Sequence, residues 1–90
     1  MKISYRFIVA GRVQGVYFRQ SAAECARQIG ATGWVRNRPD GRVEGVASGC
    51  VEALDQFRSW LACGPSAARV DDVLWIACAE MPDTGFEIRR

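Results

Sequence analysis

The stretch AGRVQGVYFRQSAAEC, residues 10–25, begins like the end of a β-strand and finishes like an α-helix. Gly11 and Gly15 lie between these two parts, and Arg19 stands where the helix is expected to begin. The N-terminus of a helix carries roughly half a positive charge, so folding alone favours an acidic residue in the first turn and Ser or Asp at the cap. The sequence has neither at these positions. An arginine without an acidic neighbour at a helix N-terminus is unfavourable for folding, which favours a functional explanation. A bound anion is therefore expected beside Arg19.

The residues on either side of this stretch predict the first strand, the first helix and a hairpin. Apolar and polar residues alternate over residues 3–10, ISYRFIVA, as in a strand with one buried face. Apolar residues then recur at helical spacing over about residues 18–29, and Gly30 follows where a left-handed C-terminal cap belongs. Residues 32–48, TGWVRNRPDGRVEGVAS, contain two β-type runs around a Pro-Asp-Gly turn signal, which predicts a β-hairpin.

The remaining residues predict a second helix and two further strands. Apolar residues recur at helical spacing from Val51 to Leu61, and Gly64 and Pro65 end this helix. RVDDVLWIACAEM, residues 69–81, is typical of a long strand, and FEIRR, residues 86–90, of a short last one after the turn PDTG.

This order of elements, β-α-β-β-α-β with a short extra C-terminal strand, predicts an α+β fold. The simplest arrangement is a ferredoxin-like sandwich in which two helices cover one face of an antiparallel sheet. A length of 90 residues fits a single domain, which we expect to span residues 1–90. Many unrelated functions use this fold, so the function has to be inferred from the site.

Composition and charge exclude several classes of protein. Hydrophobic residues make up 49% of the chain and charged ones 24%, as in ordinary folded proteins. No run approaches the roughly 18 apolar residues of a membrane helix, and the N-terminus MKISYRFIVAGR resembles no signal peptide, so a cytoplasmic protein without a membrane partner is expected. The net charge of +2 is too small for a protein that binds duplex nucleic acid and suits a small anion better.

The residue types that are absent narrow the chemistry further. The chain has no histidine, which removes the usual general base, the Ser–His and Cys–His nucleophile pairs and any His-containing metal site. The four cysteines are widely spaced without a CxxC pair, so no metal site and no cofactor are expected. Each cysteine is expected to be a small buried apolar residue, and a disulfide is left open because geometry decides it. The cysteines are Cys25, Cys50, Cys63 and Cys78.

Two segments, GRVQGVYFR at residues 11–19 and GWVRNRPDGRVEGVASG at residues 33–49, resemble the signature segments of the acylphosphatase family. The fixed positions of the first signature are met by Gly11, Val13, Gln14, Gly15, Val16, Phe18 and Arg19. Those of the second are met by Gly33, Trp34, Val35, Arg36, Asn37, Gly41, Val43 and Gly49. The resemblance implies a small metal-free enzyme that hydrolyses carboxylic–phosphoric mixed anhydrides to a carboxylate and inorganic phosphate. It also implies that Arg19 binds the phosphoryl group and that Asn37 positions the attacking water.

The chemistry of the residues agrees with these implied roles. Consecutive backbone N–H groups that curl into a helix N-terminus form a concave site for phosphate oxygens, and the Arg19 guanidinium can hold two oxygens at once. The Asn37 amide can both accept a hydrogen bond from a water and donate one to it. The phosphate-binding loop is expected to use the backbone N–H groups of Gln14, Gly15, Val16, Tyr17, Phe18 and Arg19.

An acyl phosphate expels a carboxylate whose conjugate acid has a pKa near ~4, so it leaves without a general acid. No covalent intermediate is expected. The predicted partners are therefore a small-molecule acyl phosphate and inorganic phosphate or sulfate, bound in the loop as product or inhibitor. The protein is expected to act as a monomer and to bind no nucleic acid.

Other interpretations of these residues compete with the enzymatic one. An RNA-recognition motif has the same order of elements, but the third strand, RVEGVAS, has no aromatic residue on which a base could stack. A silent regulatory domain is disfavoured because both expected catalytic side chains are present, and a metallochaperone because the first loop lacks paired cysteines. Among the remaining residues, Val13, Val16 and Phe18 are expected to anchor the loop in the core, and Trp34, Trp60 and Trp75 to pack in the core or between helix and sheet. Steering of anions and a solvated strand face remain equally open for Arg36, Arg38 and Arg42.

Overall fold

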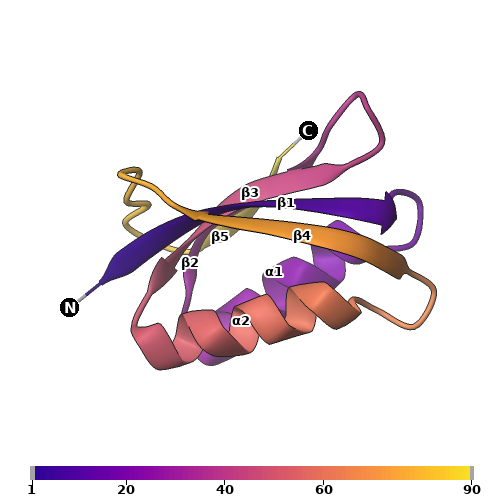
Figure 1. Cartoon of the computed structure of the whole chain (residues 1–90). Helices are drawn as coiled ribbons and strands as arrows, with labels where there is room; N and C mark the ends of the chain where they lie inside the picture. The colour runs from indigo at the N-terminus through magenta and orange to yellow at the C-terminus, as the bar shows by residue number, and fades with distance from the viewer. Residues whose placement is uncertain (1, 90) are drawn as a thin grey trace.

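The structure is a computed structural model that describes residues 2–89. It consists of one five-stranded sheet and two helices (Figure 1). The elements are β1 (Ile3–Arg12), α1 (Phe18–Ile29), β2 (Thr32–Asn37), β3 (Val43–Gly49), α2 (Val51–Cys63), β4 (Arg69–Ala77) and β5 (Phe86–Arg89). Every predicted helix and strand is present, and the predicted ferredoxin-like α+β fold is confirmed. Within residues 2–89, no helix is long and apolar enough to cross a membrane.

The strands lie in the order β4-β1-β3-β2-β5. The first four pair in antiparallel fashion, whereas β5 pairs with β2 in parallel, so the sheet as a whole is mixed. The direction of β5 follows from the path of the chain. Because β4 ends at the end of the sheet where β2 begins, the segment between β4 and β5 crosses to the opposite edge there. Strand β5 therefore starts at the same end of the sheet as β2 and runs parallel to it.

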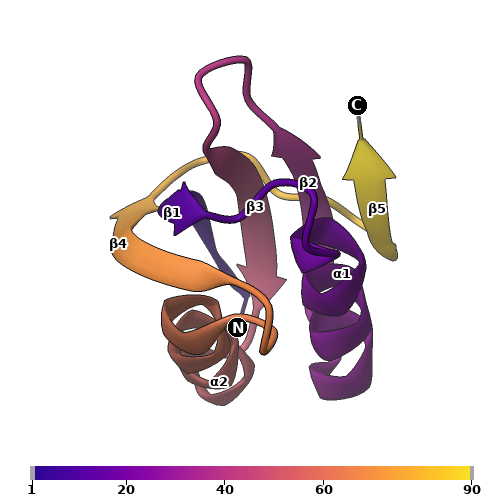
Figure 2. The same ribbon diagram turned by 90° about the vertical axis from the view of Figure 1, so that its right-hand side faces the viewer.

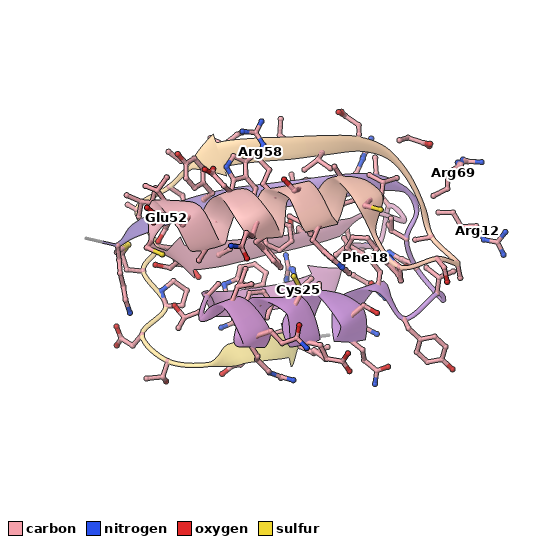
Figure 3. The ribbon with its side chains drawn as sticks, turned by 90° about the horizontal axis from the view of Figure 1, so that it is seen from below. Arg12, Phe18, Cys25, Glu52, Arg58 and Arg69 are labelled. Atoms are coloured by element: carbon pink, nitrogen blue, oxygen red, sulfur yellow. The ribbon has the colours of Figure 1, made fainter. Side chains whose placement is uncertain are left out.

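Both helices cover the same face of the sheet, as Figure 2 shows, and the core lies between the two layers. Phe57 of α2 is fully buried at the centre, edge-on to Phe7 of β1 and to Phe86 of β5. Figure 3 shows Phe18 and Cys25 of α1 between the two helices. Aromatic rings at the centre of the core therefore join α2 to β1 and to β5.

The α1 helix begins and ends where the sequence predicted. Its C-terminal cap, Gly30, has φ 80° and donates its N–H to the carbonyl of Arg27, which is the expected left-handed cap. The α2 helix ends at Gly64, whose N–H donates to the carbonyl of Trp60. Val51, which was expected on the apolar face of α2, is 53% exposed because it occupies the first position of the helix, beyond the edge of the core.

Two further expectations about burial were wrong. The cysteines are free, but none is fully buried. Cys50 and Cys63 lie at the two ends of α2 and are exposed, Cys25 packs against the core and is half-buried, and Cys78 is half-buried. Trp34 does not pack in the core, whereas Trp60 and Trp75 pack against it as expected. The buried Val35 side chain faces the helices, so alternation along β2 turns the neighbouring Trp34 ring to the uncovered face.

Candidate active site

The loop between β1 and α1 has an unusual backbone conformation. Gly15 has φ 73°, and Tyr17, the residue before the helix, has φ 61° and ψ 25°. A left-handed conformation is rare for a bulky residue such as tyrosine and costs about 1–3 kcal/mol. A Cβ atom added to Gly15 would meet no atom within 4 Å, so this side of the loop is open. Strained residues of this kind cluster at binding sites.

The N-terminus of α1 has unpaired donors and no compensating acid. No acidic residue stands in its first turn, and no side chain caps it. The first backbone hydrogen bond of the helix runs from the Ser21 N–H to the Tyr17 carbonyl. Within residues 2–89, the N–H groups of residues 14–20 have no backbone acceptor. Several donors and the positive end of the helix dipole therefore meet at one place.

A cavity of about 570 Å³ lies at this helix end and brings the two predicted catalytic residues together. Both residues line the cavity. Arg19 lies in the first turn of α1, and Asn37 is the last residue of β2. Asn37 lies on the same face of β2 as the buried Val35, which is the face toward the helices. In Figure 2 the β1–α1 connection passes over the beginning of α1 on this side of the molecule. The cavity is lined by Val13, Gly15, Tyr17, Phe18, Arg19, Gln20, Asn37 and Ile88.

The Arg19 side chain is held by the last strand. Its Nη1 donates a hydrogen bond to the backbone carbonyl of Arg89, 3.0 Å away. Among residues 2–89, no carboxylate forms an ion pair with Arg19. The guanidinium therefore has a fixed direction while its remaining N–H groups and its full charge are available to an anion.

The Asn37 side chain contains a buried acceptor without a donor. Its Oδ1 is inaccessible to solvent and accepts no hydrogen bond from any group in residues 2–89. A buried polar atom of this kind costs about 1–3 kcal/mol and calls for a functional explanation. The terminal torsion of an amide is soft, so a rotation of this side chain can present the oxygen to the cavity.

Sequence reasoning missed the role of the Gln14 side chain. Its Nε2 donates to the carbonyl of Arg38 at 2.7 Å and to that of Arg42 at 3.0 Å, which ties the loop to the β2–β3 hairpin. Of the six loop residues expected to supply N–H groups, Gln14 and Val16 do not line the cavity, and the other four do. As expected, Val13, Val16 and Phe18 are buried and anchor the loop.

The arginines of the hairpin take part in ion pairs beside the site. Glu44 is 2% exposed, and its carboxylate pairs with Arg6 at 3.0 Å, with Arg36, and with Arg38 at 3.6 Å. Arg42 pairs with the exposed Asp40 at 2.9 Å. The hydrogen bond from the Arg42 backbone N–H, aided by the nearby guanidinium groups, lowers the pKa of Asp40 below its ordinary value. The hairpin arginines thus have structural partners, and none of them lines the cavity.

The uncovered face of the sheet offers no free aromatic platform around Trp34. Its indole N–H donates to Glu80 at 2.6 Å, and the Arg89 guanidinium lies 4.7 Å from the ring centroid. Within residues 2–89, no group of three or more His, Cys, Asp or Glu side chains is arranged to hold a metal ion. At the N-terminus of α1, by contrast, donors that are unpaired in the described part of the chain lie beside a cavity.

The chain is similar to known proteins both in sequence and in structure. The sequence profile of the acylphosphatase family matches residues 5–88. An acylphosphatase from Alkalilimnicola ehrlichii is 48% identical over 98% of this chain and 99% of its own length. One from Anaeromyxobacter dehalogenans is 50% identical over 98% of this chain and 96% of its own length. The crystal structure of acylphosphatase from Bacillus subtilis superposes with a TM-score of 0.93 at 37% identity, covering 98% of this chain and 99% of that one. The profile, which matches most of the chain, and the near full-length relatives show that the chain belongs to the acylphosphatase family.

Proposed function

We propose that the cavity at the N-terminus of α1 is the site at which this enzyme hydrolyses acyl phosphates to a carboxylate and inorganic phosphate. One observation carries the proposal. Arg19 and Asn37 come from separate elements and line the same cavity, beside backbone N–H groups that have no acceptor among residues 2–89. A planar cation, a set of N–H donors and an amide able to hold water are the groups that this reaction needs.

The phosphoryl group binds to the backbone N–H groups of the loop. Gly15, Tyr17, Phe18 and Arg19 line the cavity, and Gln14 and Val16 are their neighbours in the same loop. Gly15 lets the backbone approach the anion closely, because the space where a Cβ would stand is open. The Arg19 guanidinium holds two further oxygens in the direction that the Arg89 carbonyl fixes. In phosphoryl transfer the charge spreads over three equatorial oxygens, so these fixed donors stabilise the transition state without reorganising.

The water is positioned by Asn37. The amide oxygen accepts a hydrogen bond from the water, which also gives the buried Oδ1 its missing donor. The water attacks phosphorus in line with the carboxylate leaving group, without a covalent intermediate, and its proton passes to a phosphate oxygen. The carboxylate leaves as a weak base and needs no general acid, so the reaction runs without histidine. Arg19 and the N–H groups supply the positive charge, and the mechanism needs neither a metal nor a cofactor.

The phosphate that the reaction releases occupies the same donors, so inorganic phosphate and sulfate bind in the loop as inhibitors. We further propose a single-domain monomer that works in the cytoplasm. In support of one domain, the buried apolar residues form a single cluster. Free cysteines in the described part of the chain fit a reducing compartment.

Release of phosphate from benzoyl phosphate tests the proposal, with a phosphate monoester as the control substrate. The protein is expected to hydrolyse the acyl phosphate and to leave the monoester intact, because a monoester has a poor leaving group and the site has no general acid. Activity is expected to be the same in the presence of a chelator. Hydrolysis of both substrates at similar rates would contradict the proposed mechanism.

Two variants of Arg19 test the role of the guanidinium. Arg19→Lys keeps the charge but not the planar fork, so it is expected to lose nearly as much kcat/KM as Arg19→Ala. A lysine variant with nearly normal kcat/KM would reduce Arg19 to a source of general positive charge. Circular dichroism of each variant establishes that it is folded.

A further inference from the structure

We infer that Tyr17 and Ile88 form a subsite for the acyl group, so that the enzyme prefers acyl phosphates with a bulky, apolar acyl group over acetyl phosphate. This inference rests on the proposed function, because it places the phosphoryl end of the substrate at the N-terminus of α1. Beyond the proposed function, it names two residues that select the acyl group.

The fold does not explain the tyrosine at position 17. With φ 61°, the backbone there favours glycine or asparagine, and the sequence has a bulky aromatic residue instead. The side chain gains nothing from the core, since it is 77% exposed. An aromatic residue that opposes its backbone preference and remains outside the core, in the lining of a cavity, is explained by contact with a ligand.

Ile88 is the second exposed apolar residue of the lining. It lies two residues after the buried Phe86 on the short strand β5, and therefore on the face toward the helices, and it is 40% exposed. Its register partner on β2 is Val35, two residues before Asn37, which places it next to the catalytic end of that strand. The other large apolar residues of the lining, Val13 and Phe18, are 1% exposed and can offer a ligand little surface.

The two ends of an acyl phosphate require different surroundings. The phosphoryl end is anionic and takes up the N–H groups and the Arg19 guanidinium, whereas the acyl end is uncharged and gains from apolar contact. The cavity of about 570 Å³ falls within the range of about 300–1,000 Å³ that is typical of sites for small organic molecules. A phosphate group of five heavy atoms leaves much of this space free. Tyr17 and Ile88 supply the exposed apolar surface in that remaining space, and an aromatic ring can stack on Tyr17.

The test compares kcat/KM for benzoyl phosphate with kcat/KM for acetyl phosphate in the same preparation. The measured quantity is the ratio of kcat/KM for benzoyl phosphate to kcat/KM for acetyl phosphate. This ratio in each variant is divided by the ratio in the natural protein, so that the different reactivities of the two leaving groups cancel. Tyr17→Asn removes the ring and suits the left-handed backbone, and Tyr17→Phe is the matched control that keeps the ring. Tyr17→Asn is expected to lower the ratio by about 2- to 12-fold, the effect of one aromatic contact, and Tyr17→Phe to keep it.

Ile88 provides a second, independent variant. Ile88→Ala removes three carbon atoms and is expected to lower the same ratio by about 4-fold or more, since one CH₂ group buried against the acyl group already accounts for about 4-fold, and Ile88→Leu is expected to keep it. An unchanged ratio in both Tyr17→Asn and Ile88→Ala would overturn the acyl subsite, even where both substrates are hydrolysed more slowly. In that case, phosphate release by the natural protein would still support the proposed function. If the natural protein hydrolyses neither substrate, the proposed function fails and the subsite fails with it.

Discussion

Replacement of Asn37 by valine is expected to abolish turnover and to stabilise the fold. The Asn37 Oδ1 is buried without a donor among residues 2–89, and an unsatisfied buried acceptor costs about 1–3 kcal/mol. Valine has a similar size, has no polar atom and is favoured in strands, where asparagine is disfavoured. The free energy of unfolding should therefore rise by about 1–3 kcal/mol. For a domain of this size, each kcal/mol raises Tm by about 4–8 °C.

Thermal unfolding followed by circular dichroism, together with release of phosphate from benzoyl phosphate, measures both effects. Thr32→Val is the matched control, because it makes a similar polar-to-apolar change on the same strand. The Thr32 hydroxyl donates to the Pro82 carbonyl at 2.9 Å, so its loss is expected to lower stability by about 0.5–1.5 kcal/mol and to leave turnover measurable. A variant Asn37→Val that is less stable than the natural protein would refute the energetic argument. One with ordinary turnover would remove Asn37 from the mechanism.

The other predictions concern the bound anion, the buried carboxylate and the thiols. Phosphate at ten times its dissociation constant should add about 1.4 kcal/mol of stability and raise Tm by roughly 6–11 °C. Equal shifts in the natural protein and in Arg19→Ala would mean that only the general salt effect operates. Glu44→Gln should lower the free energy of unfolding by about 1.5–3 kcal/mol in urea titrations, because a buried carboxylate bonded to arginines is lost, and an unchanged midpoint would contradict this. Burial raises the pKa of the Cys25 thiol, so peptide mapping after iodoacetamide should find Cys50 and Cys63 modified first, and early modification of Cys25 would contradict its burial.

Local patterns in the sequence were sufficient to predict the elements that carry the site. Alternation along β1, the glycine turn and the helical spacing after Phe18 gave α1 its observed bounds, because these signals depend on neighbouring residues only. The unusual arginine at the N-terminus of α1, Arg19, can also be recognised from residues within a single turn of the helix. It predicted an anion site, and the structure places Arg19 in the lining of a cavity at that position.

Contacts between distant segments could not be predicted in the same way. Gln14 binds carbonyls 24 and 28 residues away, and the carbonyl that holds Arg19 is 70 residues away. The strand periodicity showed that one face is buried but could not show that Trp34 lies on the uncovered face. The burial of Glu44 could not be predicted either, because it depends on arginines that the sheet brings together. The parallel pairing of β5 similarly depends on where β4 ends.

The local rules that this chain breaks are broken around a single cavity, and a bound substrate can relieve two of the three violations. Tyr17 is held in a left-handed conformation, α1 has no acid in its first turn, and Asn37 has a buried acceptor without a donor among residues 2–89. Together these features cost several kcal/mol of a stability that is typically about 5–15 kcal/mol. In the proposed mechanism, a phosphoryl group takes the place of the missing acid, and the attacking water donates a hydrogen bond to the Asn37 amide. Because a bound anion brings this relief, part of the unfavourable energy of the free enzyme contributes to binding at the place where the proposed reaction occurs.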